Sequence, residues 1–375
     1  MQSVGAVIQS EMNGRPALRI AIRADASAEI GTGHIRRCQS LATTLRNRGA
    51  EVRFVCRDFG FDYEPILGEQ PSILATPPGI VTNEDNAPTH ARWLGVTQLH
   101  DSNDFVATLN QWSPDWVLVD SYAIDARWHG AVRAAVGCRI AVIDDLADRQ
   151  LDTDLLIDHN WHKDHRAKYS GWLDRQPMLA TGPAYALIDQ KYASAMRYQF
   201  KNEVRSIGIF MGGTDANNAS GMAFEAVIKS NFQGYIEIVT MASNPHLGDL
   251  QSLAKSRSKT YITLDLPNLA AFFSRHDLQI GAGGGATWER FCIGAPTIAV
   301  ATANNQRDVL TDLVRCGFQW GLSRIDLDLL SKVIREALDN PSQRLRQMMR
   351  GLALIDGLGT NRVAEFFQLS NLKGQ

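Results

Sequence analysis

The sequence has few cysteines, no long apolar run and no excess of charge of one sign. Its five cysteines are an odd number, lie far apart and include no Cys-x-x-Cys pair. We therefore expect neither a disulfide framework nor a thiolate zinc site, and we expect the reducing cytoplasm as the compartment. No apolar run approaches the ~20 residues that a membrane-spanning helix needs. The net charge of −2, from 38 basic and 40 acidic residues, argues against nucleic acid as the main partner.

Several well-known catalytic motifs are also absent from the sequence. It contains no Gly-x-Ser-x-Gly elbow and no Walker lysine motif. The spacing of His159, His162 and His165 matches no known metal site, so we expect no metal and no cofactor. Residues 1–17 do not have the charged and then apolar order of a secretion signal, and we interpret them as an N-terminal extension.

The length and the hydrophobic pattern predict two α/β domains. A chain of 375 residues is too long for one small core. Short β-rich runs alternate with helical patterns in two series, which a polar stretch separates. The runs of the first series lie at 17–23, 51–56, 116–120, 139–144 and 154–158, and those of the second at 205–211, 234–240, 260–264, 278–280 and 297–301. This alternation is typical of doubly wound parallel sheets. We expect one domain at 18–188, a linker at 189–203, and a second domain with C-terminal helices at 204–375.

The first candidate site is the loop between the strand at 17–23 and a helix predicted over 36–48. Gly31 and Gly33 stand on either side of Thr32, and His34 follows at the mouth of the helix. Glycines allow backbone amides to approach a ligand, and a helix N-terminus attracts phosphate. A helix N-terminus also disfavours the imidazolium form, so we expect a neutral His34 that can accept a proton. A tight turn with a solvated histidine is the alternative, because the third glycine of the Rossmann pattern is missing.

A second glycine loop follows the strand at 205–211. Gly213 and Thr214 have the chemistry to offer backbone amides and a hydroxyl to a phosphate. The alternative for this loop is a simple connection that is capped by Asp215 or Asn217. The loop alone does not decide between the two.

A third glycine loop precedes a helix that is predicted to begin near Ala286. Gly283, Gly284 and Gly285 suit a diphosphate at the helix N-terminus. Glu289, about one turn into that helix, has the chemistry to accept hydrogen bonds from both ribose hydroxyls, or it is an ordinary glutamate on a helix surface. Asn305 lies in a further loop, which we expect at the same edge of the sheet.

Taken together, these motifs resemble one family, the UDP-2,4-diacetamido-2,4,6-trideoxy-β-L-altropyranose hydrolases of pseudaminic acid biosynthesis. The matching stretches span about residues 18 to 310 in order, at 23–27, 30–34, 37–38, 120–122, 144–149, 154–158, 160, 182–187, 212–215, 281–284, 287–290 and 305–306. The sequence departs from the family pattern at Arg36 and Gln39, where apolar residues are expected, and in its N-terminal stretch.

The resemblance implies a GT-B architecture, in which two Rossmann-like domains face a cleft. It further implies that His34 is the base that activates water, that Glu289 and the Thr287 helix hold the ribose, and that Asn305 lies near the sugar and phosphates. The expected substrate is a UDP-sugar, and the expected products are UDP and 2,4-diacetamido-2,4,6-trideoxy-L-altrose. A monomer is compatible with this arrangement, and the sequence leaves the oligomeric state open.

The expected reaction is the attack of water, activated by His34, on C1 of the sugar with inversion. A positioned histidine base is worth ~10²–10⁴-fold in rate. Attack at the β-phosphorus gives the same products and stays open at this point. The main alternative is a GT-B glycosyltransferase, in which a sugar hydroxyl replaces water and an acceptor groove is required. A non-catalytic nucleotide-sugar binding protein would need Glu289 but not His34.

Overall fold

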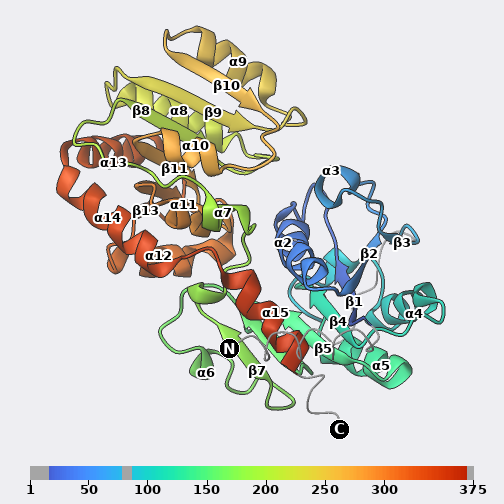
Figure 1. Ribbon diagram of the computed structural model, residues 1–375. Coiled ribbons are helices and arrows are strands. Elements are labelled where there is room, and N and C mark those ends of the chain that lie inside the picture. Colours follow the sequence, from blue (N-terminus) through green and yellow to red (C-terminus); the bar gives the residue numbers. More distant parts are fainter. Residues whose placement is uncertain (1–16, 78–86, 370–375) are drawn as a thin grey trace, which may run out of the picture.

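The computed structural model describes residues 17–77 and 87–369, and it contains two parallel β-sheets with helices on both faces (Figure 1). The predicted N-terminal extension therefore lies almost entirely outside the described residues. In the described ranges, no helix combines the length and the apolar character that crossing a bilayer requires.

The first sheet has seven parallel strands, and β4 lies at its centre with β1 beside it. Their spatial order is β3 (Ser72–Leu74), β2 (Glu51–Arg57), β1 (Arg19–Ala24), β4 (Trp116–Asp120), β5 (Arg139–Ile143), β6 (Leu155–Asp158) and β7 (Met178–Thr181). All five residues of β4 are buried, as expected for a strand that is covered on both faces of a parallel sheet. Because β1 pairs directly with β4, the loops that follow these two strands meet at one edge.

Helices cover both faces of the first sheet. They are α2 (Gly33–Asn47), α3 (Glu64–Leu67), η1 (Ala91–Leu94), α4 (Gln98–Leu109), α5 (Ala126–Val136), α6 (His165–Lys168) and η2 (Pro183–Tyr185). Apolar residues of α2 pack on one face, and those of α4 and α5 pack on the other. The side chain of Thr97 caps α4 and that of Asp125 caps α5, because each accepts a hydrogen bond from a backbone N–H of the first turn.

The second sheet has six parallel strands. Their order is β10 (Thr260–Leu264), β9 (Tyr235–Thr240), β8 (Ser206–Phe210), β11 (Leu278–Ala282), β12 (Thr297–Val300) and β13 (Trp320–Leu322). The remaining helices are α7 (Lys191–Ser194), α8 (Ala219–Lys229), α9 (Leu247–Lys255), α10 (Ala270–Arg275), α11 (Ala286–Ile293), η3 (Asn304–Gln306), α12 (Arg307–Arg315), α13 (Leu327–Asp339), α14 (Pro341–Leu354) and α15 (Gly359–Leu369). The strands β8, β11 and β12 are neighbours, so the loops that follow them share one edge of this sheet.

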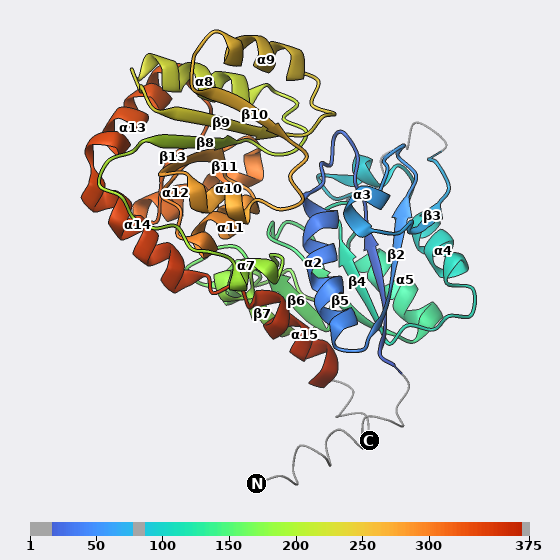
Figure 2. The ribbon, with the colours of Figure 1, turned by 45° about the horizontal axis from the view of Figure 1, so that its top comes forward.

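The last helix, α15, packs on the first sheet instead of the second. Its residues Val363, Ala364 and Phe367 belong to the same buried cluster as the strands β1 and β4. Figures 1 and 2 both show α15 beside β7 and away from the second sheet, and α15 also packs against η2. The expectation that residues 204–375 form one unit therefore fails for α15, because its apolar face completes the core of the first domain.

Candidate functional site

His34 lies in the first turn of α2, directly beyond the carboxyl end of β1. It is 8% exposed, and its Nδ1 lies 2.6 Å from Oδ1 of Asp120, the last residue of β4. Gly31 reverses the chain before this turn with a φ of +77°, a backbone conformation that suits glycine. The predicted loop thus delivers its histidine to the sheet edge, where an aspartate meets it.

Asp120 is the partner that fixes the ring of His34. Arg37 donates two hydrogen bonds to the Asp120 carboxylate, from Nε and from Nη2, each 2.6 Å long. Burial alone would raise the pKa of Asp120, but the charges of Arg37 and His34 hold it well below its usual range. An ionised carboxylate only accepts hydrogen bonds, so Nδ1 of His34 carries the proton. In the neutral imidazole, Nε2 is then the nitrogen that accepts a proton.

An aromatic wall stands beside His34. The rings of His34 and Tyr122 meet edge to face, with 4.8 Å between centroids, and Trp93 follows at 6.5 Å from His34. The Tyr122 hydroxyl donates a 2.5 Å hydrogen bond to Oδ1 of Asp145, whose Oδ2 accepts from Asn160. This network holds the tyrosine next to the histidine.

Asn305 of the second domain contacts the tyrosine that lies beside His34. It belongs to η3, and its Nδ2 lies 3.5 Å from the Tyr122 hydroxyl oxygen, at the outer limit of a hydrogen bond. A second contact between the domains joins the rings of Trp161 and Phe318, with 5.4 Å between centroids. The structure therefore brings two of the sequence-predicted residues, His34 and Asn305, into contact with the same tyrosine, Tyr122.

The other predicted residues of the second domain lie at the carboxyl ends of β8 and β11. Gly283 and Gly284 pack against the side chain of Gln306, which also accepts a hydrogen bond of 2.9 Å from the backbone of Thr302. Gly285 is exposed and immediately precedes α11. The predicted third glycine loop thus stands at a helix N-terminus.

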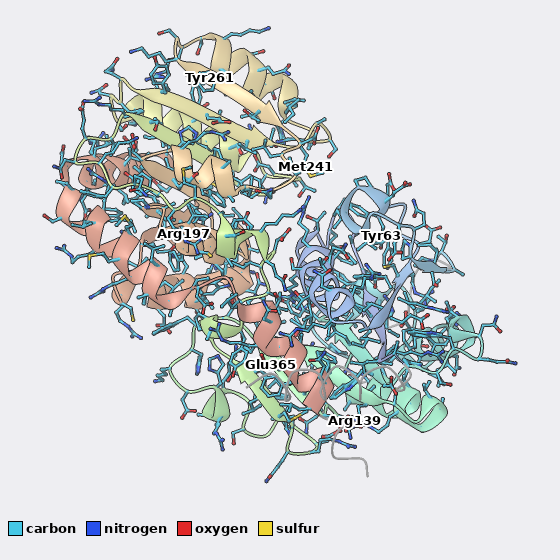
Figure 3. All side chains as sticks on the ribbon, viewed as in Figure 1. Tyr63, Arg139, Arg197, Met241, Tyr261 and Glu365 are labelled. Carbon is cyan, nitrogen blue, oxygen red and sulfur yellow. The ribbon has the colours of Figure 1, made fainter. Side chains whose placement is uncertain are left out.

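The loop after β8 has a mixed outcome. Gly213 lies so close to Met241 that a Cβ at this position would meet the Met241 sulfur at 2.5 Å, and Thr214 is half-buried. Figure 3 shows Met241 on the side of the second domain that faces the first. Asp215 caps α8, since its carboxylate accepts from the backbone N–H groups of Ala219 and Ser220. Asp215 thus plays the capping part that the sequence offered for it, and the contact of Gly213 and Thr214 with a phosphate stays a prediction.

Glu289 is half-buried in the first turn of α11. Burial raises the pKa of Glu289 to about 7, although the Tyr192 hydroxyl and the charge of Arg36 favour the ionised form. Thr287 is buried, and its hydroxyl accepts a hydrogen bond from Arg290. Of these two predicted ligands, Glu289 has the more accessible side chain.

Sequence reasoning gave no role to Asp120, Arg37 or Tyr122. Asp120 is the last residue of a strand that pairs with β1. Its place at the carboxyl end of a strand was the one sequence feature that could have marked it as a site residue. Strand pairing cannot be read from one sequence, however, so the meeting of Asp120 with His34 was not foreseeable from spacing.

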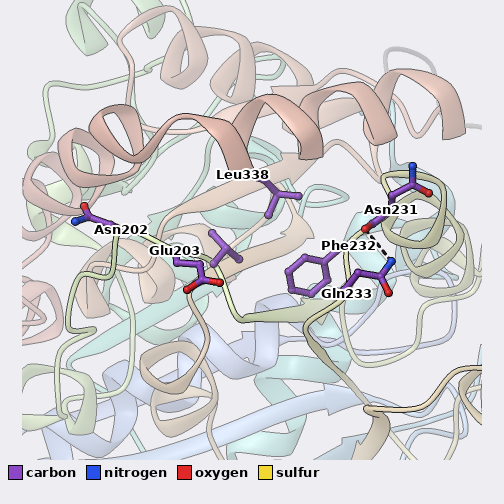
Figure 4. Close-up of a pocket in the computed structure, with 7 residues that line it drawn as sticks. Asn202, Glu203, Asn231, Phe232, Gln233 and Leu338 are labelled. Atoms are coloured by element: carbon purple, nitrogen blue, oxygen red, sulfur yellow. Dashed lines mark hydrogen bonds between the residues drawn. The ribbon is translucent and has the colours of Figure 1, made fainter.

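A groove of about 460 Å³ lies at the opposite edge of the second sheet (Figure 4). Its lining residues precede β8 or β9 or belong to α13, and they are Asn202, Glu203, Val204, Asn231, Phe232, Gln233 and Leu338. None of the sequence-predicted site residues lines it. We therefore assign the candidate site to the junction around His34 and not to this groove.

Comparison with known proteins confirms the resemblance that the motifs indicated. No protein-family model matches the chain. The chain is 24% identical over 306 residues to the UDP-2,4-diacetamido-2,4,6-trideoxy-beta-L-altropyranose hydrolase of Campylobacter jejuni, and the match covers 80% of this chain and 98% of that protein. It is 20% identical over 361 residues to the spore coat polysaccharide biosynthesis protein SpsG of Bacillus subtilis, with 94% and 98% covered.

Solved structures confirm the predicted fold class. MurG from Acinetobacter baumannii matches with a TM-score of 0.62 at 14% identity, covering 94% of this chain and 99% of that chain. MnaA from S. aureus, solved with UDP, matches with a TM-score of 0.63 at 12% identity, covering 96% and 98%. The molecule has the GT-B architecture of two Rossmann-like domains.

Proposed function

We propose, from this likeness and from the geometry at His34, that the protein is an enzyme that processes a UDP-sugar. The specific reaction that we propose is the hydrolysis of UDP-2,4-diacetamido-2,4,6-trideoxy-β-L-altropyranose in pseudaminic acid biosynthesis. Its products are UDP and 2,4-diacetamido-2,4,6-trideoxy-L-altrose. The name of the C. jejuni relative supports the substrate, and the name of the B. subtilis relative supports a role in making a surface glycan.

The pairing of His34 with Asp120 is the observation that carries the proposal. An ionised Asp120 directs the proton of the neutral ring to Nδ1, so Nε2 is the basic nitrogen. In residues 17–77 and 87–369, Nε2 has no hydrogen-bond partner. It therefore remains available to take a proton from water.

The proposed step begins with a water molecule that donates a hydrogen bond to Nε2. The water oxygen attacks C1 of the sugar from the face opposite UDP and gives its proton to His34, and the C1–O bond breaks with its electron pair on the departing UDP. The configuration at C1 is inverted. General-base help of this kind contributes ~10²–10⁴-fold to the rate.

In this proposal, glycine loops of both domains would hold the diphosphate. Backbone amides of Gly31 and Gly33 in the first domain, and of Gly213 and residues 283–285 in the second, would approach it, with the Thr214 hydroxyl beside them. Glu289, on the same helix as Thr287, would accept hydrogen bonds from the ribose hydroxyls. Asn305 would contact the sugar and phosphates. We also assign the reaction to the cytoplasm, since all five cysteines are free, as in proteins of reducing compartments.

A direct test is to incubate the purified protein with this UDP-sugar in the absence of any acceptor. We expect UDP release by the native protein, and a loss of release by ~10²–10⁴-fold in His34→Ala with UDP affinity retained. A protein that releases UDP only when an acceptor sugar or lipid is added would be a glycosyltransferase instead. UDP binding with no release under either condition would support the non-catalytic alternative.

A further inference from the structure

Arg290 is a fully buried arginine that has too few hydrogen-bond acceptors. It belongs to α11 and is 0% exposed. Its Nη2 donates to the carbonyl oxygen of Ala282 at 2.8 Å and to Oγ1 of Thr287 at 3.0 Å. Nε and Nη1 have no hydrogen-bond partner among the residues that the structure describes. Most of the five N–H groups of this guanidinium thus have no acceptor.

Three other buried arginines are compensated by carboxylates. The ion pairs are Arg23–Asp101 and Arg57–Asp101, each 2.8 Å long, and Arg149–Asp144, 2.7 Å long. Arg344 lacks such a pair, but it donates to the carbonyl oxygens of Ala337 and Leu338 at the end of α13 and to that of Asn202. The C-terminal end of a helix favours a cation. Within the described residues, Arg290 has neither kind of compensation.

The guanidinium of Arg290 lies beneath the glycine loops. A Cβ on Gly281 would meet Nη1 of Arg290 at 2.5 Å and the carbonyl oxygen of Phe210 at 2.8 Å. Gly281 belongs to β11 and Phe210 is the last residue of β8, and these two strands pair side by side. The loops at 212–214 and 283–285 follow these strands directly. The buried positive charge therefore lies where both loops begin, together with the N-terminus of α11.

Burying a cation without a counter-charge is unfavourable. Burial lowers the pKa of Arg290 to about 10, with Glu289 and Tyr192 favouring the charged form, so Arg290 stays charged at neutral pH. Glu289, its neighbour in the sequence, is half-buried and favours the charged form through its own charge, but the two side chains form no ion pair in the described ranges. An anion at the two loops would offset the unfavourable burial of this charge.

We propose that Arg290 is the built-in counter-charge for the diphosphate of the bound nucleotide and for UDP as it departs. It acts through the glycine loops without touching the ligand, so it is a positioning residue and not a catalytic one. The inference rests on the proposed function, since it takes a nucleoside diphosphate as the ligand. A buried guanidinium can attract the diphosphate electrostatically although neither solvent nor ligand reaches it.

The test compares the affinities of UDP and uridine, which differ only in the diphosphate. UDP binding is measured by titration calorimetry and uridine binding by NMR titration. In Arg290→Met we expect UDP binding to weaken by roughly tenfold or more and uridine binding to change by less than about twofold. Arg290→Lys retains the charge and should keep most of the UDP affinity. Arg344→Met removes another buried arginine and should leave the ratio of the two affinities unchanged.

Several outcomes would overturn the inference. Equal losses for UDP and uridine in Arg290→Met would mean a purely structural role, and an unchanged UDP affinity would mean no role. If Arg290→Met does not fold, Arg290→Gln against Arg290→Lys makes the same comparison, and equal UDP affinities in these two variants would contradict it. A native protein that does not bind UDP would overturn the proposed function as well. A native protein that binds UDP but does not hydrolyse the sugar nucleotide would contradict the hydrolysis alone.

Discussion

His34 and Asp120 form the residue pair on which the proposed chemistry depends. The carboxylate of Asp120 accepts from Nδ1 of His34 at 2.6 Å and is held ionised by Arg37. This arrangement determines both the orientation of the ring and the nitrogen that carries the proton. Asp120 therefore matters for the reaction both through its charge and because its carboxylate only accepts hydrogen bonds.

We expect Asp120→Asn to lower kcat by ~10²–10⁴-fold with little change in KM, because an amide can donate to Nδ1 and favour the wrong tautomer. Steady-state kinetics on the UDP-sugar measures both constants. Asp115→Asn is the matched control, since Asp115 lies just before β4, at the other end of that strand. Equal kinetic effects of the two substitutions would contradict the assigned role of Asp120.

The raised pKa of Glu289 leads us to expect that nucleotide binding depends on pH. Burial raises the pKa of Glu289 to about 7, and only the ionised carboxylate accepts hydrogen bonds from both ribose hydroxyls at full strength. The affinity for a UDP-sugar should therefore fall as the pH drops from 8 to 6. Isothermal titration calorimetry measures this affinity, and a His34→Ala background prevents turnover of the UDP-sugar during the measurement.

The control for this pH dependence is Glu289→Gln in the same background. This variant should bind the UDP-sugar more weakly, with an affinity that stays nearly constant from pH 8 to pH 6. An affinity that is independent of pH in the presence of Glu289 would argue against its contact with the ribose.

At the scale of elements, the positions of most strands were predictable and their partners were not. The runs at 116–120 and 260–264 coincide with β4 and β10. The strand β4 is buried along its whole length and is continuously apolar, whereas β10 is a half-exposed edge strand that is rich in β-branched and aromatic residues. The edge strands β3 and β13 have only three residues each, too few for a pattern to emerge. The helix that carries His34 begins at Gly33, earlier than predicted, because glycine and histidine give no helical signal.

The helix α15 illustrates what periodicity cannot predict. Its pattern indicated a helix, but no pattern states which sheet a helix will cover. Phe367 is fully buried, and its ring meets that of Trp116 with 5.0 Å between centroids. The C-terminal helix thus returns to the first domain and ties the end of the chain to its central strands.

We expect Phe367→Ala to lower the free energy of unfolding by about 3–5 kcal/mol, the usual loss for a large buried aromatic side chain. Chemical denaturation measures this change. Leu369→Ala on the same helix is the control, because Leu369 is 55% exposed and its removal should change stability by less than about 0.5 kcal/mol. Similar effects of the two substitutions would show that α15 does not support the core.

At the scale of the whole molecule, the candidate site is divided between two sheets. The first domain carries His34 and the aromatic wall, and the second carries Glu289 and the glycine loops at 212–214 and 283–285. Asn305 and Tyr122 meet across the junction at 3.5 Å. The sequence could predict the glycine loops, because strand ends and glycine runs are local features. It could not predict the contacts of Asp120 or Tyr122, since these depend on how strands and domains pair.

The same division explains the nearly neutral charge of the chain. The formal net charge is −2, although the proposed ligand is an anion. Helix N-termini, backbone amides and one buried arginine act locally, so they can attract a diphosphate without an overall basic excess. A nearly neutral chain is therefore compatible with the proposed nucleotide ligand.

The most direct measurement is the acceptor-free reaction run in H₂¹⁸O, with the mass of the released UDP determined. Reading the label in UDP avoids the exchange of oxygen at C1 that a free sugar undergoes through ring opening. We expect UDP to be released without ¹⁸O, because water attacks C1 and the original bridging oxygen leaves with UDP. Released UDP that carries one ¹⁸O would contradict attack at C1, and no release of UDP would contradict hydrolysis itself.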